Sequence, residues 1–198
     1  VKGSGMPLAP PPRRSNQVMK NPEIADWFYL HAWKPSLIPV SPAPSDAGQL
    51  TWLVFVPGLV LPDSISSIRG QAKKMICIVP TAKETVEIIG ENTWQLNPGN
   101  RDHYMNLFSQ LQKDGLMPDR IIHYWNVDQI ESTPDSVDYH LEYGYYSLLF
   151  TVQAFNKHSK GQSLHIDTVV SGLREISAEG VQHPVKGTVP GLLKVIPQ

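Results

Sequence analysis

The chain is poor in the residues that most sites of α/β enzymes require. It has one cysteine, Cys77, inside an apolar run, so it can form no internal disulfide, and we expect this side chain to fill the core. The only Gly-x-Gly is Gly3-Ser4-Gly5, which no strand-like run precedes, so it cannot be a dinucleotide-binding loop. The P-loop pattern, Gly-x-x-x-x-Gly-Lys-Ser/Thr, is also missing. The usual glycine loops for phosphate binding are therefore excluded.

Catalytic and metal-binding spacings are missing too. None of the seven tyrosines has a lysine four positions later, the pairing that a short-chain reductase needs on one helical face. Ser171-Gly172 follows a strand-like run, but the full Gly-x-Ser-x-Gly pattern of a nucleophile elbow is absent. The seven histidines show no paired ligand spacing. We expect His123 and His165 to be hydrogen-bonded histidines of the core or a sheet edge, and we expect solvent-facing positions for the following three: His140, His158 and His183.

Charge is nearly balanced. There are 17 Lys and Arg against 18 Asp and Glu, for a net charge of -1, so no basic field is present to hold nucleic acid or an anionic membrane. No run approaches the roughly 20 apolar residues that span a bilayer, and the first residues show no signal-peptide pattern. With a single thiol, these features favour a reducing cytoplasm.

The 198 residues are enough for one large domain with an extended flank. Residues 1–22 contain Pro7 and a triple proline, which favour an extended linker. We expect residues 23–198 to form the folded domain. Within it, the aromatic run at 27–33 reads as a first strand and is followed by a proline-rich loop at 35–48.

From residue 50 onward, strand-like and helix-like segments alternate. We expect strands at the following positions: 51–56, 76–79, 85–89, 120–125 and 164–170. We expect helices over the following ranges: 63–74 with Asp63 as N-cap, 101–114, about 141–160, and from Pro184 through Val195. Such alternation implies parallel strands joined by right-handed crossovers. The predicted fold class is α/β: a truncated Rossmann-like, mostly parallel sheet flanked by helices.

The end of the strand at 51–56 is informative about function. Pro57-Gly58 stands where a dinucleotide-binding enzyme places its phosphate loop, but the residues that follow Gly58 are Leu59-Val60-Leu61. These residues cannot bring several backbone amides close to a pyrophosphate. A nucleotide-binding type of fold without its nucleotide site favours a scaffolding or docking role.

Two other segments keep alternatives open. Asp128, Glu131 and Asp135 cluster after the strand ending at Trp125, so a small α/β enzyme with an unrecognised site there is the alternative to a noncatalytic role. The tyrosines in 139–146 could form a partner-binding face or pack within the domain.

Five stretches of the chain resemble, in order, the start of the ketoreductase region in modular type I polyketide synthases. They are Asn21–Tyr29 with Trp33–Ser36, Thr51–Phe55, Ile121–Asn126, Leu148–Phe155, and the closing segment His183–Gln198. The resemblance covers roughly residues 20–198. It identifies residues 1–22 as part of the linker that follows an acyltransferase, and the rest as the N-terminal, structural subdomain of a ketoreductase.

The resemblance implies a noncatalytic role. In that family this half carries no catalytic residue, and the NADPH site belongs to the adjoining catalytic half, so we expect no cofactor or metal in this chain. The family's first strand crosses to the catalytic half, which implies an interdomain contact by the aromatic run: Trp27, Phe28, Tyr29 and Trp33. The implied partners are the catalytic half and neighbouring synthase domains. An acyl carrier domain is a further possible partner, although such domains are acidic and the chain has few adjacent basic pairs.

Overall fold

The computed structural model describes residues 23, 47–127, 130, 133–174 and 180–196. The chain divides into two compact units, residues 1–36 and 37–198, and the second is described here. The proline-rich segment and the aromatic run at 27–33 lie outside the described residues. The predicted linker, first strand and domain boundary at residue 22 therefore stay predictions.

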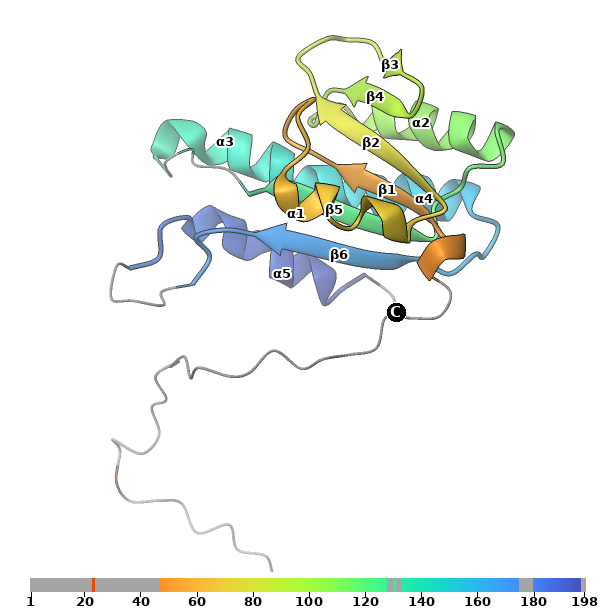
Figure 1. The fold of residues 1–198 in the computed structure, drawn as a ribbon. Helices are drawn as coiled ribbons and strands as arrows, with labels where there is room; N and C mark the ends of the chain where they lie inside the picture. Colours follow the sequence, from red (N-terminus) through yellow and green to blue (C-terminus); the bar gives the residue numbers. More distant parts are fainter. Residues whose placement is uncertain (1–22, 24–46, 128–129, 131–132, 175–179, 197–198) are drawn as a thin grey trace, which may run out of the picture. The chain divides into compact units, whose positions relative to one another are not determined.

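The described part of the chain forms one six-stranded sheet in the order β3-β4-β2-β1-β5-β6 (Figure 1). The strands are β1 (Thr51–Phe55), β2 (Lys74–Pro80), β3 (Glu87–Gly90), β4 (Thr93–Leu96), β5 (Arg120–Asn126) and β6 (His165–Val170). All neighbouring strands are parallel except the β3–β4 pair. The predicted mostly parallel, Rossmann-like sheet is confirmed.

The central strand β1 is apolar on both sides because both faces of the sheet are covered. Leu53 and Phe55 point into the cluster beneath the long helices, whereas Trp52 and Val54 belong to a second cluster on the opposite face. All four residues are at most 1% exposed.

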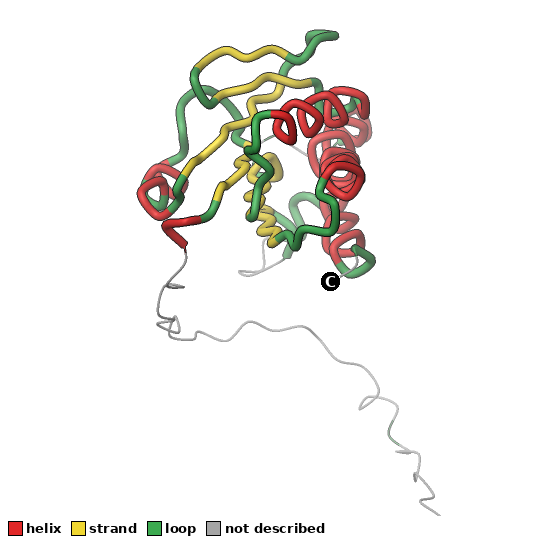
Figure 2. The backbone as a smooth tube through the Cα atoms, turned by 90° about the vertical axis from the view of Figure 1, so that its right-hand side faces the viewer, coloured by secondary structure: helices red, strands yellow, loops and turns green. Residues whose placement is uncertain are grey.

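Long helices cover one face of the sheet (Figure 2). They are α2 (Arg101–Lys113) and a continuous helical segment made of α3 (Val137–His140), a π-helical turn (Leu141–Tyr146) and α4 (Ser147–His158). The N-terminus of α2 is capped by the Asn100 side chain, which accepts from the Asp102 amide, and Gly115 at φ +67° stands just beyond its end. The predicted helices at 101–114 and about 141–160 are thereby confirmed.

The closing helix is shorter than predicted. Pro184–Gly187 form a 3₁₀ turn, and α5 covers Thr188–Leu193. Its Val189 and Leu192 pack on Leu148 of α4. Within the described ranges, no helix has the length and apolar character needed to cross a bilayer.

The predicted helix from Asp63 through Lys74 is wrong. The one-turn helix α1 covers only Asp63–Ser66, a 3₁₀ turn follows at Arg69–Gln71, and the N-cap is Pro62, which makes no side-chain capping bond. The serines and Gly70 in this segment are weak helix formers, which explains the early end.

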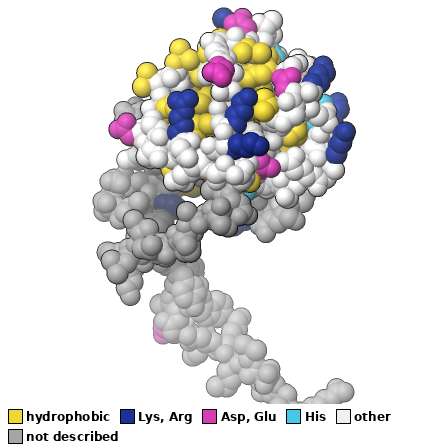
Figure 3. Space-filling view, turned by 45° about the vertical axis from the view of Figure 1, so that its right-hand side comes forward, with side chains coloured by type: hydrophobic (Ala, Val, Ile, Leu, Met, Phe, Trp, Pro, Cys, Tyr) yellow, Lys and Arg dark blue, Asp and Glu magenta, His cyan; other side chains and the backbone are white. Residues whose placement is uncertain are grey.

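The short helix leaves part of the sheet face uncovered. A cavity of about 330 Å³ lies there, and its lining includes Met75, Cys77, Arg69 and Leu59. Cys77 is half-buried rather than fully enclosed; burial raises the pKa of its thiol, and the nearby Arg69 charge partly opposes this. On the side of the molecule seen in Figure 3, hydrophobic side chains reach the surface between Lys and Arg side chains.

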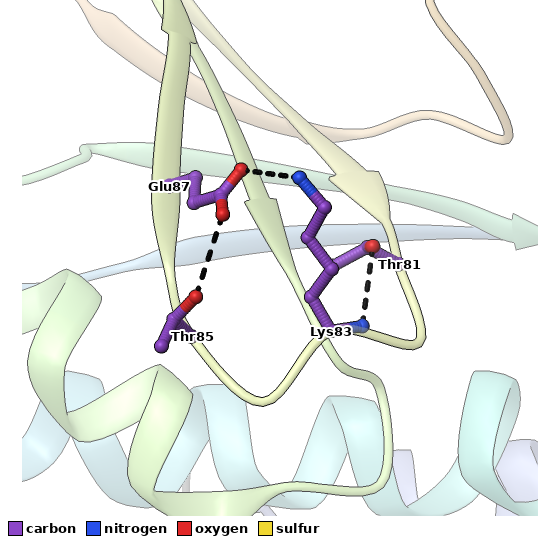
Figure 4. A network of polar contacts seen from close by, with 4 residues as sticks. All are labelled: Thr81, Lys83, Thr85 and Glu87. Atoms are coloured by element: carbon purple, nitrogen blue, oxygen red, sulfur yellow. Dashed lines mark hydrogen bonds and ion pairs between the residues drawn. The ribbon is translucent and has the colours of Figure 1, made fainter.

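The sequence also gave no indication of the β3–β4 hairpin at the sheet edge. The predicted strand at 85–89 is β3, shifted to Glu87–Gly90 and paired antiparallel with the unpredicted β4. The turn before β3 is held by an ion pair of 2.6 Å between Lys83 and Glu87 and by a hydrogen bond from Thr85 to Glu87 (Figure 4). The exposed ion pair contributes little to stability.

Candidate functional site

Open parallel sheets bind ligands outside the carboxyl ends of the strands where the strand order reverses. In this sheet that point lies between β1 and β5. Trp125 at the end of β5 donates its indole N–H to the carbonyl oxygen of Val56 at 2.9 Å, and its ring stands edge-on to Phe55 at 4.9 Å. Trp125 is 1% exposed and Val56 is fully buried. Side chains of the protein itself therefore fill the crevice.

The loop after β1 does not have the geometry of a phosphate-binding turn. Glycines in such turns are needed where a backbone or ligand comes close. A Cβ atom added at Gly58 would meet no atom within 4 Å. The next residues, Leu59 and Val60, are 70% and 88% exposed. No close approach of another atom therefore requires a glycine at position 58.

A buried polar network lies beside the crevice. His123 on β5 contacts Ser147 Oγ through Nε2 at 2.8 Å and Asn126 Nδ2 through Nδ1 at 3.2 Å. Ser147 donates its hydroxyl proton to the Tyr143 carbonyl at 2.8 Å, so it accepts from His123, and the neutral tautomer with a proton on Nε2 satisfies every partner. Burial lowers the pKa of His123 to about 3. His123, Asn126 and Ser147 are therefore uncharged at ordinary pH.

The same network reaches the C-terminal segment through Lys186. This side chain is 1% exposed, and its Nζ donates to the Asn126 carbonyl at 2.9 Å and to Ser171 Oγ at 3.4 Å. Ser171 in turn donates to the same carbonyl at 3.2 Å. Ser171, which follows β6, and Lys186, which precedes α5, thus both bind the backbone at the end of β5.

The π-helical turn fits this packing. Gly144 lies so close to Asn126 that an added Cβ would be 2.5 Å from Asn126 Oδ1 and 3.1 Å from Val189 Cγ2. The wider π turn and the missing side chain let the helix approach both β5 and α5. π-helical turns are frequent at functional sites; here the turn supports packing contacts.

The predicted positions of the histidines are partly confirmed. His123 is a hydrogen-bonded core histidine, and His165 lies exposed on the edge strand β6, 3.1 Å from Asp167. The prediction of solvent-facing positions is wrong for His140 and His183, which are 2% and 7% exposed. Their rings lie 5.4 Å apart because α3 and the turn before α5 meet in the fold, a contact that sequence spacing does not reveal.

His158, which was also predicted to face solvent, has intermediate burial. Its Nδ1 contacts Gln112 Oε1 at 3.2 Å. Among the residues that the structure describes, no three His, Cys, Asp or Glu side chains come together in a way that could hold a metal ion.

The predicted site residues mostly lie where the structure gives no description. The interdomain aromatic residues Trp27, Phe28, Tyr29 and Trp33 lie outside the described residues, as do Asp128 and Glu131. Asp135 is exposed in the 3₁₀ turn Pro134–Ser136. The interdomain contact and the alternative carboxylate site both stay predictions.

The row of tyrosines Tyr139, Tyr143 and Tyr146 along α3 and the π turn divides into two groups. Tyr139 and Tyr143 stack at 4.2 Å, and Tyr143 packs against Trp125 at 5.7 Å, so they extend the core. Tyr146 is 40% exposed and stacks on Phe150. The sequence left both roles open, and the fold assigns only Tyr146 of this row to the surface.

Together, sheet order and crevice define an α/β protein of Rossmann-like topology whose ligand crevice is occupied by its own side chains. A family model described as "beta-ketoacyl synthase-like, N-terminal" matches residues 52–198, well over half of the chain. The chain belongs to this family. The comparison with curated proteins gives no match.

Solved structures share the fold. One is the adenylation, ketoreductase and pseudo-Asub multidomain structure of a keto acid-selecting NRPS module, with 22% identity, a TM-score of 0.63, and coverage of 78% of this chain and 13% of that one. Another is an N-terminal ketoreductase from the macrolactin assembly line, with 21% identity, a TM-score of 0.52, and coverage of 71% and 27%. The predicted resemblance to the ketoreductase region of a modular synthase is confirmed in family and fold. The chain spans a minor part of both chains.

Proposed function

We propose that this chain is the noncatalytic structural half of a polyketide synthase ketoreductase. In this role it stabilises and organises an adjoining NADPH-binding catalytic half during β-keto processing of carrier-bound intermediates. The observation that carries the proposal is the filled crevice between β1 and β5, where the Trp125 indole donates a hydrogen bond to the Val56 carbonyl oxygen. A Rossmann-like sheet that fills its own ligand crevice can still present helices and edges to a neighbour. We expect the protein to work in the cytoplasm.

The first experiment tests cofactor binding. We expect calorimetric titration of the purified chain with NADPH to give no saturable heat, because the crevice is closed and the loop after β1 offers no amide cradle. A complete ketoreductase that contains the catalytic half serves as the positive control. Saturable binding at micromolar NADPH would contradict the noncatalytic role and favour the alternative, a small enzyme with a site near Asp128, Glu131 and Asp135.

The second experiment tests the supporting role through the aromatic run. The proposed contact with the catalytic half uses Trp27, Phe28, Tyr29 and Trp33, and burying such side chains stabilises an interface by several kcal/mol at roughly 25 cal/mol per Å². We expect Trp27→Ala to weaken association with a separately supplied catalytic half, or to lower its reductase activity, while Trp27→Phe retains most of both. Unchanged association, activity and stability in Trp27→Ala would exclude this contact.

A further inference from the structure

One surface hollow combines negative charge with exposed aromatic rings. Asp138, Glu142, Tyr146 and Phe150 recur every fourth residue along the helical segment from α3 to α4, and with Gly99 they line a hollow of about 240 Å³. We call these five residues the acidic aromatic groove. Asp138, Glu142 and Tyr146 are exposed and Phe150 is half-buried. The groove is distinct from the filled crevice and from the polar network.

Within the part of the chain that the structure describes, the two carboxylates of the groove have no partner of opposite charge. Among the described residues, neither Asp138 nor Glu142 makes an ion pair, and no Lys or Arg belongs to the groove lining. The Glu142 carboxylate lies against Gly99, where an added Cβ would be 3.0 Å from its carboxyl carbon. Burial raises the pKa of Tyr143, and the Glu142 charge raises it further, which is consistent with negative potential at this place.

The aromatic side of the groove is held in place. Tyr146 and Phe150 are stacked at 5.9 Å and 20°, and Phe150 packs on the buried Tyr104 at 5.7 Å. Two carboxylates one helical turn apart beside a fixed aromatic face suit a planar cation, which can stack on the ring and donate to both acids. A guanidinium meets both conditions, whereas the compact ammonium of lysine does not stack.

The size of the groove indicates what kind of group fills it. Pockets for small molecules usually enclose about 300–1,000 Å³, and this hollow is smaller, at about 240 Å³. It is also open at the surface between the helical segment and the loop before α2, so it can receive one side chain of another protein. We propose that the acidic aromatic groove binds an arginine side chain of a partner protein. The proposed function supplies the type of partner, an adjoining synthase domain, but the chemistry of the groove can be tested without it.

The test uses blocked arginine (N-acetyl-arginine amide) titrated into the full chain with labelled aromatic residues, followed by NMR. We expect saturable shifts of the Tyr146 and Phe150 ring signals. Blocked citrulline has nearly the same shape without the charge, and we expect it to bind at least about tenfold more weakly. Equal responses to arginine and citrulline, or no response of these two rings to arginine, would overturn the proposal.

Variants distinguish arginine binding in the groove from nonspecific attraction to negative charge. The double change D138N/E142Q should abolish the arginine response, whereas Glu91→Gln removes another exposed, unpaired carboxylate and should leave it unchanged. Gly99→Ala keeps both charges but places a methyl group beside Glu142, so we expect weaker binding. An unchanged arginine response in the double variant would overturn the proposal. If the chain binds arginine but fails to associate with a catalytic half, the proposed function is contradicted while the proposal for the groove stands. The two failures are therefore distinguishable.

Discussion

At the level of single residues, the polar side chains behind β5 are the most constrained part of the molecule. His123, Asn126 and Ser147 are buried and satisfy one another without a net charge. Buried networks of this kind stabilise a fold only while every donor and acceptor is paired. Protonation of one member, or a small steric change there, should therefore lower the free energy of unfolding of the whole protein.

The first prediction concerns pH. His123 has a pKa of about 3 in the folded protein, against about 6.5 when unfolded. Between these values the unfolded chain binds the additional proton, so this residue's contribution to stability is present above about pH 6.5 and is lost as the pH falls toward 3. The slope is at most about 1.4 kcal/mol per pH unit. Urea denaturation between pH 4 and 7 should give a smaller slope for His123→Gln than for the unchanged protein; equal slopes would contradict the prediction.

The second prediction concerns the close contact at Gly144. A methyl group there would overlap with Asn126 Oδ1, and its other neighbour is Val189, so we expect Gly144→Ala to lower the free energy of unfolding by about 1–3 kcal/mol. Gly191 in α5 is the matched control because an added Cβ meets nothing within 4 Å. Gly191→Ala should be neutral or slightly stabilising. Thermal and urea unfolding measure both variants, and equal stabilities would show that the helix can move away from β5.

At the level of elements, sequence periodicity predicted most strands and both long helices. β1 is apolar from Trp52 to Phe55, β5 is rich in apolar and aromatic residues between Ile121 and Trp125, and α2 has apolar residues at helical spacing. The same signal failed at α1, where apolar residues also recur at helical spacing but serines and Gly70 end the helix after one turn. The four-residue strands of the β3–β4 hairpin are too short to show a clear period.

The candidate site was less predictable than the fold. The missing glycine loop could be read from Pro57-Gly58 and the residues after it, but nothing local indicates that Trp125 reaches the Val56 carbonyl. The burial of His140 and His183 likewise depends on contacts between distant segments. Such long-range contacts leave no periodic pattern in the sequence.

A third prediction tests the link between β5 and β1. Trp125→Phe keeps an aromatic ring in the core but leaves the buried Val56 carbonyl without the indole donor, a loss that costs about 1–3 kcal/mol. Trp94 on β4 is 9% exposed, and its replacement by Phe removes only packing. We expect Trp125→Phe to lower the free energy of unfolding more than Trp94→Phe does. Equal losses, measured by urea denaturation, would mean that the indole hydrogen bond contributes nothing measurable.

At the level of the whole molecule, the described residues build a hydrophobic core on both faces of the sheet. All the buried members of the three hydrophobic clusters lie between Trp52 and Leu192. Because these clusters span both faces of the sheet, the described part of the chain has its own core. In the proposed function, the aromatic run at 27–33 serves the contact with a neighbouring domain.

The fourth prediction tests the expected domain boundary at residue 22. Deleting residues 1–22, the predicted linker, should change the free energy of unfolding by no more than about 0.5 kcal/mol. Deleting residues 1–46 also removes the aromatic run at 27–33 and should abolish association with a separate catalytic half. Urea denaturation and calorimetric binding measure the two effects. A large loss of stability on removing 1–22 would place the start of the folded domain earlier than residue 23.

The tryptophan in the β1–β5 crevice also bears on how such a protein can evolve. Inserting a glycine-rich turn after Phe55 would not by itself create a cofactor site, because the indole and its aromatic neighbours would still lie between the ends of β1 and β5. Removing the indole alone would weaken the core without creating a phosphate cradle. A cofactor site at this edge of the sheet would therefore require both changes together.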